Sequence, residues 1–140
     1  MIKITGFEHV SWASSDLEPG TSILALFGIK PTGFEEIPTQ AVTTNYFEEP
    51  ETGVRFEIIR PATPDSHLHK YLKERGPGLH HICLQVEDLD DACEQVKAAG
   101  GTIVGGKFTD SRGRHAFIHP KSTGGVLIGM IELYPELKNK

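Results

Sequence analysis

Hydrophobic and polar residues alternate most regularly in the stretch 78–89. Ile82, Leu84 and Val86 are apolar, and the residues between them are polar or reactive, beginning with His81. This period of two predicts a β-strand with one packed face and one face that carries reactive side chains. His81 belongs to the second face, because successive side chains point to opposite sides of a strand. A single strand histidine is more often a hydrogen-bonded residue than a metal ligand, so this strand alone does not define a site.

The same pattern occurs earlier in the chain. Residues 7–17 align without a gap on residues 79–89 at an offset of 72, which pairs His9 with His81. The offset also pairs two Asp-Leu dipeptides and two glycines that would end helices. Such a fixed offset indicates an internal duplication, in which each copy reads as a strand, a helix and three further strands.

The chain therefore predicts two βαβββ modules joined by a short amphipathic helix. We expect a single domain of 140 residues, with the first module at 1–61, the linker helix within 62–77 and the second module at 78–134. Strands are expected at 2–13, 32–37, 40–47, 54–60, 81–86, 102–104, 114–118 and 126–133, and helices at 17–27, 66–75 and 88–99. The Gly-rich, basic segment 105–113 is expected to be a flexible hairpin loop, because it lacks the spacing of a phosphate-binding loop.

A carboxylate joins the duplicated histidines in this arrangement. Glu57 alternates with packing residues in the fourth strand of the first copy. If the first strands of the two copies lie side by side, His9 and His81 converge, and Glu57 faces them. Two imidazoles and a carboxylate predict a site for a divalent first-row metal, which could be Co, Mn, Zn, Ni or Fe. The same three residues fit a 2-His-1-carboxylate iron centre and a three-ligand zinc site, and their spacing in the sequence does not distinguish the two.

A site without metal is the alternative interpretation. Glu57 would then pair with Arg55 or Arg60, and the histidines would hydrogen-bond to each other or to the backbone. The duplication favours the metal, because a repeated histidine with a carboxylate on the matching face is difficult to obtain by chance. The offset makes Gly129 the equivalent of Glu57, and glycine has no side chain to offer.

Composition narrows the possible partners and setting. The net charge of −5, with both signs interspersed, argues against nucleic acid or an anionic membrane as the main partner. The chain has no apolar run of membrane-spanning length and no signal-peptide pattern at its start. Its two cysteines lack CxxC spacing, so a reduced, cytoplasmic setting is expected. A sheet with exposed edges favours a homodimer.

Several segments resemble the vicinal oxygen chelate (glyoxalase/bleomycin resistance/dioxygenase) superfamily and, within it, the methylmalonyl-CoA epimerases. These segments are 8–10, 57–61, 65–66, 71–82, 117–122 and 125–128, so the resemblance covers nearly the whole chain. It implies an α+β fold, in which two βαβββ modules form a cupped, open mixed sheet. It also implies that His9, Glu57 and His81 fall on metal-ligand positions.

Two positions depart from the epimerase pattern. The last strand of the epimerases carries a glutamate, both ligand and acid/base group, where this chain has Gly129, and their opposing acid/base glutamate corresponds to Thr44. Proton transfer would then move to another catalytic group, such as Tyr46, Glu48 or Glu132. Glu132 stands three residues from Gly129, so it faces the other side of the strand unless a bulge intervenes.

These features leave three functional hypotheses. The first is an isomerase- or lyase-like enzyme, similar to the epimerases and glyoxalase I, that acts on a small carbonyl or acyl-thioester substrate by stabilising an enediolate. The second is a non-haem iron oxygenase-type enzyme, which the open coordination positions would permit. The third is a non-catalytic protein that binds a small ligand.

Overall fold

The computed structural model describes residues 1–138, and its elements follow the duplicated order. In the first copy they are β1 (Ile4–Ala13), α1 (Glu18–Ala25), β2 (Lys30–Ile37), β3 (Val42–Glu49) and β4 (Val54–Pro61). The helix α2 (His67–Arg75) comes next. The second copy contains β5 (Gly78–Val86), α3 (Leu89–Ala98), β6 (Ile103–Thr109), β7 (Gly113–Ile118) and β8 (Ile128–Leu133). The predicted α+β class and the order of elements are confirmed.

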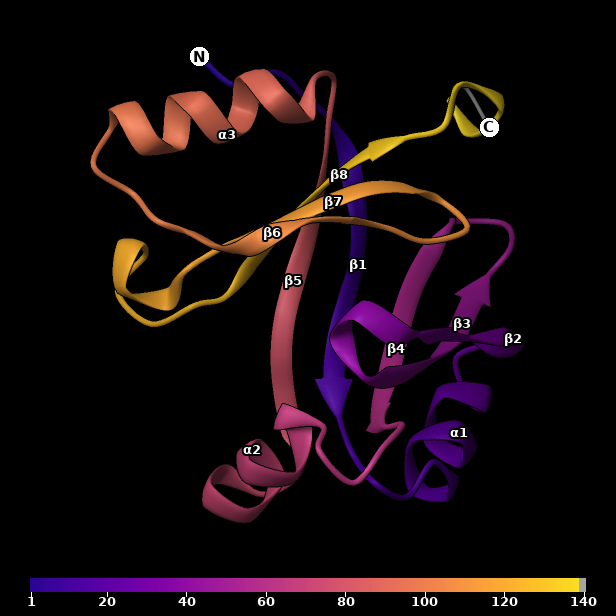
Figure 1. The fold of residues 1–140 in the computed structure, drawn as a ribbon. Helices are drawn as coiled ribbons and strands as arrows, with labels where there is room; N and C mark the ends of the chain where they lie inside the picture. Colours follow the sequence, from indigo (N-terminus) through magenta and orange to yellow (C-terminus); the bar gives the residue numbers. More distant parts are fainter. Residues whose placement is uncertain (139–140) are drawn as a thin grey trace. The chain divides into compact units, whose positions relative to one another are not determined.

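The strands form one mixed sheet in the described part of the chain (Figure 1). Hydrogen-bonded neighbours follow the order β2-β3-β4-β1-β5-β8-β7-β6. The pairs β1–β4 and β5–β8 are parallel, whereas β2–β3, β3–β4, β6–β7 and β7–β8 are antiparallel. In each copy the first strand therefore pairs with the fourth, which brings residues from the two ends of a module onto one surface.

The chain divides into two compact units. One contains residues 1–8 together with the chain from His81 onward, and the other contains residues 9–80. Because β1 and β5 cross these boundaries, each of them contributes residues to both units. The module boundaries expected from the sequence, 1–61, 62–77 and 78–134, stay a prediction.

In the unit formed by residues 9–80, the strands have one face packed against α1. Its apolar cluster consists of Leu24, Ile29, Phe47 and Ile58, with Trp12, Leu17 and Phe56 beside them. The helix approaches the sheet closely at Gly20, where an added Cβ would lie 2.8 Å from Ile58 Cδ1. Side chains of opposite parity on these strands, including His9 and Glu57, face away from α1.

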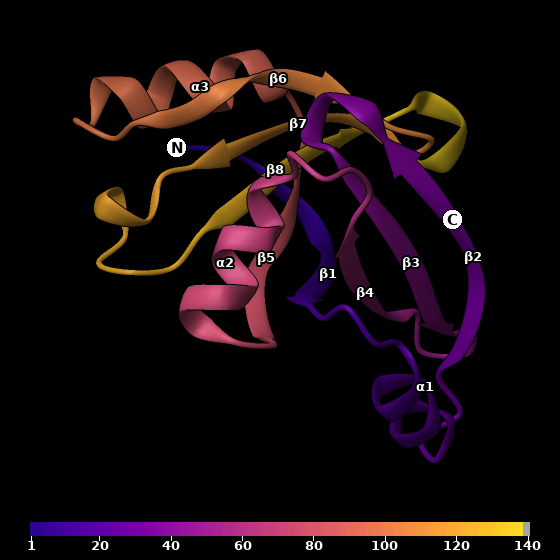
Figure 2. The same cartoon turned by 60° about the horizontal axis from the view of Figure 1, so that its bottom comes forward.

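In the other unit, α3 lies along one face of the strands β5 to β8 (Figures 1 and 2). This face contains the buried cluster Val86, Leu89, Ala92, Cys93, Ala116 and Met130. The opposite face holds a second buried cluster of Cys83, Ile131 and Leu133. The expectation that only one face of β5 packs is therefore wrong, because Ile131 and Leu133 of β8 cover the side that also carries Cys83.

The segment 105–113 differs from its prediction as a loop. β6 continues to Thr109, and Phe108 pairs with His115 of β7 in the antiparallel register. The Phe108 ring stacks on His115, with ring centroids 4.9 Å apart. The β6–β7 register is irregular between Val104 and Phe108, and Gly105 and Gly106 lie within this irregular segment. The sequence pattern missed this extension because glycines usually mark turns, whereas here they lie within a bulged strand.

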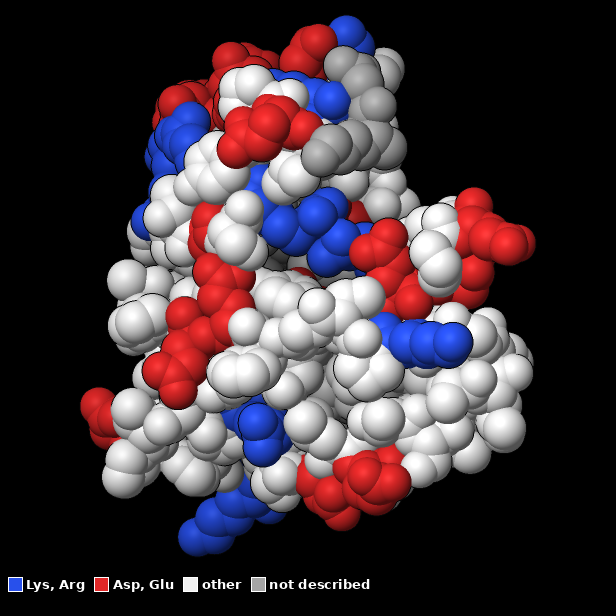
Figure 3. Space-filling model, turned by 90° about the vertical axis from the view of Figure 1, so that its right-hand side faces the viewer, with Lys and Arg blue, Asp and Glu red and all other residues white. Residues whose placement is uncertain are grey.

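Charges of both signs lie close together on this protein. The face in Figure 3 carries acidic and basic side chains, and neither sign covers it alone. Asp90 lies 2.8 Å from Arg114 and 2.7 Å from Lys107, and hydrogen bonds from these two groups lower its pKa to about 2. Within the described residues, every helix is too short or too polar to cross a bilayer.

Candidate metal centre

His9 and Glu57 form a buried pair on neighbouring strands. β1 and β4 run in parallel, and both side chains project from the face of these strands that is opposite α1. His9 Nε2 lies 3.1 Å from Glu57 Oε2, with side-chain exposures of 3% and 9%. A carboxylate removed from water needs a close positive or hydrogen-bonding partner, and the imidazole supplies one.

Ser11 adjoins Glu57 on the same face. The two residues are partners in the β1–β4 register, and Ser11 is fully buried. Within residues 1–138, its Oγ has no hydrogen-bond partner. A buried hydroxyl usually finds a partner, so Ser11 marks this surface as a place for a polar ligand atom.

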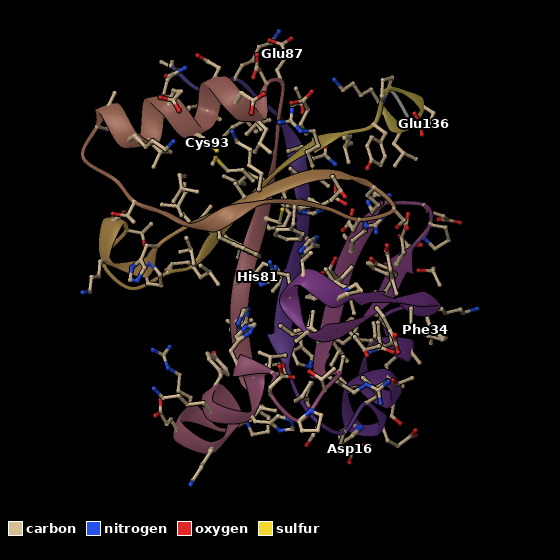
Figure 4. All side chains as sticks on the ribbon, in the orientation of Figure 1. Asp16, Phe34, His81, Glu87, Cys93 and Glu136 are labelled. Carbon is tan, nitrogen blue, oxygen red and sulfur yellow. The ribbon has the colours of Figure 1, made fainter. Side chains whose placement is uncertain are left out.

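His81 occupies β5 in the other unit, where Figure 4 labels it. Its side chain is buried, and its ring contacts Phe117 edge to face at a centroid distance of 4.9 Å. Phe117 is the register partner of Gly129, so the aromatic ring lies beside that glycine. A Cβ added at Gly129 would lie 3.1 Å from Phe117 Cε1 and 3.2 Å from Cys83 Sγ. The surroundings of Gly129 are thus tight, and Phe117 and Cys83 would have to shift to admit a side chain there.

His9, Glu57 and His81 satisfy the distance requirement for a metal-binding group. Each offers one ligand atom, and these atoms lie within 4.8 Å of one another. His81 is joined by one peptide bond to His80, the last residue of the unit that contains His9 and Glu57. Two imidazole nitrogens and one carboxylate oxygen, all on buried residues, are a donor set suited to a divalent first-row metal.

Tyr46 is the predicted catalytic residue that adjoins this group directly. It is the register partner of Glu57 in the β3–β4 pair, so both side chains project from the same face of the sheet. Its hydroxyl donates a hydrogen bond of 2.7 Å to Glu35 Oε2. Glu35 belongs to β2 and is the register partner of Thr44. Sequence reasoning missed Glu35, because only the strand pairing reveals that it lies beside position 44.

The other two predicted catalytic residues contact different partners. Glu48 Oε2 lies 3.4 Å from Arg55 Nη1. Glu132 accepts the backbone N–H of Leu89 at 2.9 Å, which caps the start of α3, and lies 3.6 Å from Arg114. The β7–β8 register runs without a bulge, so Glu132 shares the α3 face with Met130 and points away from the face of Gly129. Catalytic roles for Glu48 and Glu132 stay predictions.

His80 lies beside the candidate ligand His81 and is held neutral at pH 7. Burial, together with the nearby charges of His67 and Arg75, lowers its pKa to about 4. Its ring contacts Tyr71 at a centroid distance of 5.0 Å. His80 therefore adds no positive charge next to the candidate ligand at neutral pH.

A second buried His–carboxylate pair occurs in the unit that contains His81. His115 Nε2 lies 2.8 Å from Asp110 Oδ2, and both side chains are less than 10% exposed. Burial raises the pKa of the Asp110 carboxyl, but the hydrogen bond from His115 and backbone N–H donors outweigh it, so the net pKa is lowered. The sequence offered no signal for this pair, because Asp110 lies in the segment expected to be a flexible loop.

Comparison with known protein families gives a match over most of the chain. The family model described as the Glyoxalase/Bleomycin resistance protein/Dioxygenase superfamily matches residues 8–118. This interval includes His9, Glu57 and His81.

Individual relatives agree with that match. An ethylmalonyl-CoA/methylmalonyl-CoA epimerase from Cereibacter sphaeroides is 31% identical over 127 residues, which cover 86% of this chain and 92% of the relative. The crystal structure of methylmalonyl-CoA epimerase from Mycobacterium tuberculosis superposes with a TM-score of 0.87 at 28% identity, covering 100% of this chain and 95% of that one. A variant of the Streptomyces coelicolor methylmalonyl-CoA epimerase, in complex with 2-nitronate-propionyl-CoA, has a TM-score of 0.81 at 25% identity, covering 94% and 99%. These likenesses confirm the fold expected from the sequence.

Proposed function

Because the chain belongs to the glyoxalase/bleomycin resistance protein/dioxygenase superfamily, we propose that it is a metal-dependent enzyme. It would remove the proton from the α-carbon, next to the carbonyl group, of an acyl-thioester or related carbonyl substrate. The observation that carries the proposal is the group His9, Glu57 and His81, whose donor atoms lie within 4.8 Å of one another. These three residues would hold the metal.

The donor set determines what these residues can contribute. Three protein ligands leave coordination positions that a substrate oxygen can take. When bound, a divalent metal supplies Lewis acidity, which stabilises negative charge on a carbonyl oxygen. Glu57 would balance part of the charge of a bound metal, and burial of the three residues keeps bulk water away from them. Co, Mn, Zn, Ni and Fe all suit this donor set.

The substrate class is proposed from the relatives. The Streptomyces coelicolor epimerase binds an acyl-CoA analogue, and the Cereibacter sphaeroides relative is an acyl-CoA epimerase. An acyl-thioester has an acidified α-proton and a carbonyl oxygen suited to the proposed metal. Proton abstraction from that carbon is therefore the reaction we propose for this chain.

Thr44 and Gly129 argue against unchanged epimerase chemistry. Epimerisation needs one proton-transfer group on each side of the α-carbon. This chain has no carboxylate at either position, and Phe117 and Cys83 occupy the space around Gly129. We therefore propose that the chain removes an α-proton on one side of the substrate to form an enolate for an isomerase- or lyase-type step, rather than inverting the configuration of the substrate.

A metal experiment tests the site. Protein purified without chelators should contain about one first-row metal per chain, and His9→Ala or Glu57→Ala should lose most of it. His69→Ala is the matched control, because His69 is exposed and its Nε2 lies 3.0 Å from the Thr63 carbonyl oxygen. Equal metal content in all four proteins would contradict the proposed ligand set.

An exchange experiment tests the reaction. The protein, loaded with Co²⁺ or Mn²⁺, is incubated in D₂O with propionyl-CoA and methylmalonyl-CoA, and deuterium at the α-carbon is followed by mass spectrometry. We expect exchange that Glu57→Ala abolishes, with retained configuration of the product. Absence of exchange with every divalent metal would overturn the proposed function.

An oxygenase is the second candidate, because two histidines and one carboxylate also form the ligand set of non-haem iron oxygenases. Oxygen consumption by the Fe²⁺-loaded protein, measured with 2-oxo acids and with acyl-CoA, separates the two candidates. Oxygen uptake coupled to substrate loss, without α-proton exchange, would favour the oxygenase.

A further inference from the structure

We propose that Tyr46 transfers the proton and that Glu35 serves as its proton acceptor, so that this pair replaces the carboxylate missing at Thr44. The inference rests on the proposed function and names the group that carries out its chemical step. Three observations support it: the strand register, the hydrogen bond between the two side chains and the placement of Glu35 beside Thr44.

Tyr46 stands next to the candidate metal ligand Glu57. The two residues are directly opposite each other in the antiparallel β3–β4 pair. Directly opposed residues in such a pair have Cβ atoms about 5 Å apart and point to the same side. Ser11 is opposite Glu57 on the other neighbouring strand, so Glu57 lies between a hydroxyl on β1 and a phenol on β3. A substrate carbonyl held near Glu57 would present its α-carbon toward one of these neighbours.

Glu35 supplies a carboxylate to the place where the sequence has none. It is directly opposite Thr44 in the β2–β3 pair, and the pairing continues through Glu36 and Ile37 without a shift. Thr44 is buried and its side chain cannot act as an acid or base near neutral pH. The Glu35 carboxylate instead reaches the Tyr46 hydroxyl at 2.7 Å. Because Glu35 is half-buried, its proton can still exchange with solvent.

The proposed step is balanced within this pair. The substrate Cα–H bond breaks, and its proton forms a new O–H bond at Tyr46 Oη. The original hydroxyl proton of Tyr46 passes to Glu35 Oε2, which becomes a neutral carboxylic acid. The electron pair of the C–H bond moves into the substrate to give an enolate. Before reversal, the hydroxyl of Tyr46 and the carboxylic acid of Glu35, both partly exposed, exchange their protons with D₂O. The reverse step then delivers a deuteron from Tyr46 Oη to the same face of the carbon, and Glu35 returns its deuteron to Tyr46.

Glu35→Gln separates proton acceptance from positioning. The amide oxygen of glutamine can still accept the tyrosine hydrogen bond, but the amide cannot take up the proton. We expect kcat for α-proton exchange to fall by about 100-fold or more, with KM changed by less than about threefold. Glu36→Gln is the matched control, because Glu36 neighbours Glu35 on β2, is exposed and faces the other side. Its exchange rate should equal that of the unmodified protein.

Tyr46→Phe should cause a similar loss, and the double variant Tyr46→Phe/Glu35→Gln should lose no more than either single variant, because the two residues act as one unit. Glu35→Asp should recover part of the rate, because it restores a carboxylate on a shorter side chain. Thermal unfolding and Co²⁺ binding of each variant establish that fold and metal site are retained. If Glu35→Gln fails to fold, Glu35→Asp and Tyr46→Phe provide the comparison.

The outcomes distinguish failure of the role of Tyr46 and Glu35 from failure of the proposed function. If the unmodified protein exchanges the α-proton and Glu35→Gln retains more than about a tenth of the rate, the inference is overturned while the proposed function stands. A larger loss with unchanged KM supports the inference. If the unmodified protein binds metal but never exchanges the proton, the proposed function itself fails, and the role of Tyr46 and Glu35 fails with it.

Discussion

Gly129→Ala tests whether packing has closed the position where the epimerase pattern has a glutamate. The added Cβ would lie 3.1 Å from Phe117 Cε1, 3.2 Å from Cys83 Sγ and 3.4 Å from the Ile82 carbonyl oxygen. Favourable carbon contacts begin near 3.5 Å, so the neighbours must move by a few tenths of an ångström. The partly buried Phe117 ring can move, whereas Cys83 is only 1% exposed. We expect a loss of about 1–2 kcal/mol in the free energy of unfolding.

Urea unfolding followed by circular dichroism measures this loss, with Gly106→Ala as the control. Gly106 also lies in a strand, but no atom comes within 4 Å of a Cβ added there. Its substitution should leave stability unchanged or raise it by less than about 1 kcal/mol. Gly129→Glu should be less stable than Gly129→Ala, because its carboxylate enters the same packed region. A Gly129→Ala variant as stable as the Gly106→Ala control would refute the packing explanation.

Three further predictions concern the charged residues. Glu132→Ala leaves the Leu89 N–H without its acceptor, so the free energy of unfolding should fall by about 1–2 kcal/mol. The rate of α-proton exchange should stay normal. Loss of exchange in a variant of normal stability would instead give Glu132 a catalytic role. Asp110→Asn should destabilise by about 1–3 kcal/mol in urea, because it breaks the buried contact with His115, and unchanged stability would contradict that role. The lowered pKa of Asp110 also means that its carboxylate stabilises the fold above the unfolded value of 3.8 and loses this effect as pH falls through the folded value; melting curves between pH 5 and 2 should therefore show a shallower acid dependence in Asp110→Asn. For Glu57→Gln, calorimetric Co²⁺ titration should show at least about 10-fold weaker binding, and equal affinity would remove Glu57 from the ligand set.

The candidate ligands could be found from sequence because their placement depends on local rules applied twice. The offset of 72 identifies His9 and His81 as equivalents, and the two-residue period of a strand puts Glu57 on the matching face. Glu35 could not be found in this way. Its place beside Thr44 depends on which strand pairs with β3 and in which register, and both are set by contacts between distant segments.

The sequence pattern also could not predict the packing around His81 or the length of β6. The Phe117 ring beside His81 follows from the β7–β8 register, which no local motif reveals. The extension of β6 through Gly105 and Gly106 contradicts the usual meaning of two glycines. It accompanies the pairing of Phe108 with His115 of β7, whose rings stack on each other. In both cases a contact between neighbouring strands overrides a local preference.

The position of β2 at one end of the strand order bears on how this protein could have diverged. An outermost strand is hydrogen-bonded on one side only, so a slide of two residues along β3 would leave the buried strands undisturbed. Such a slide would exchange Glu35 for a residue two places away and put a different side chain beside Thr44. Selection could thus change the proposed proton-handling group of this protein by shifting one outermost strand, without altering the histidines or the hydrophobic interior.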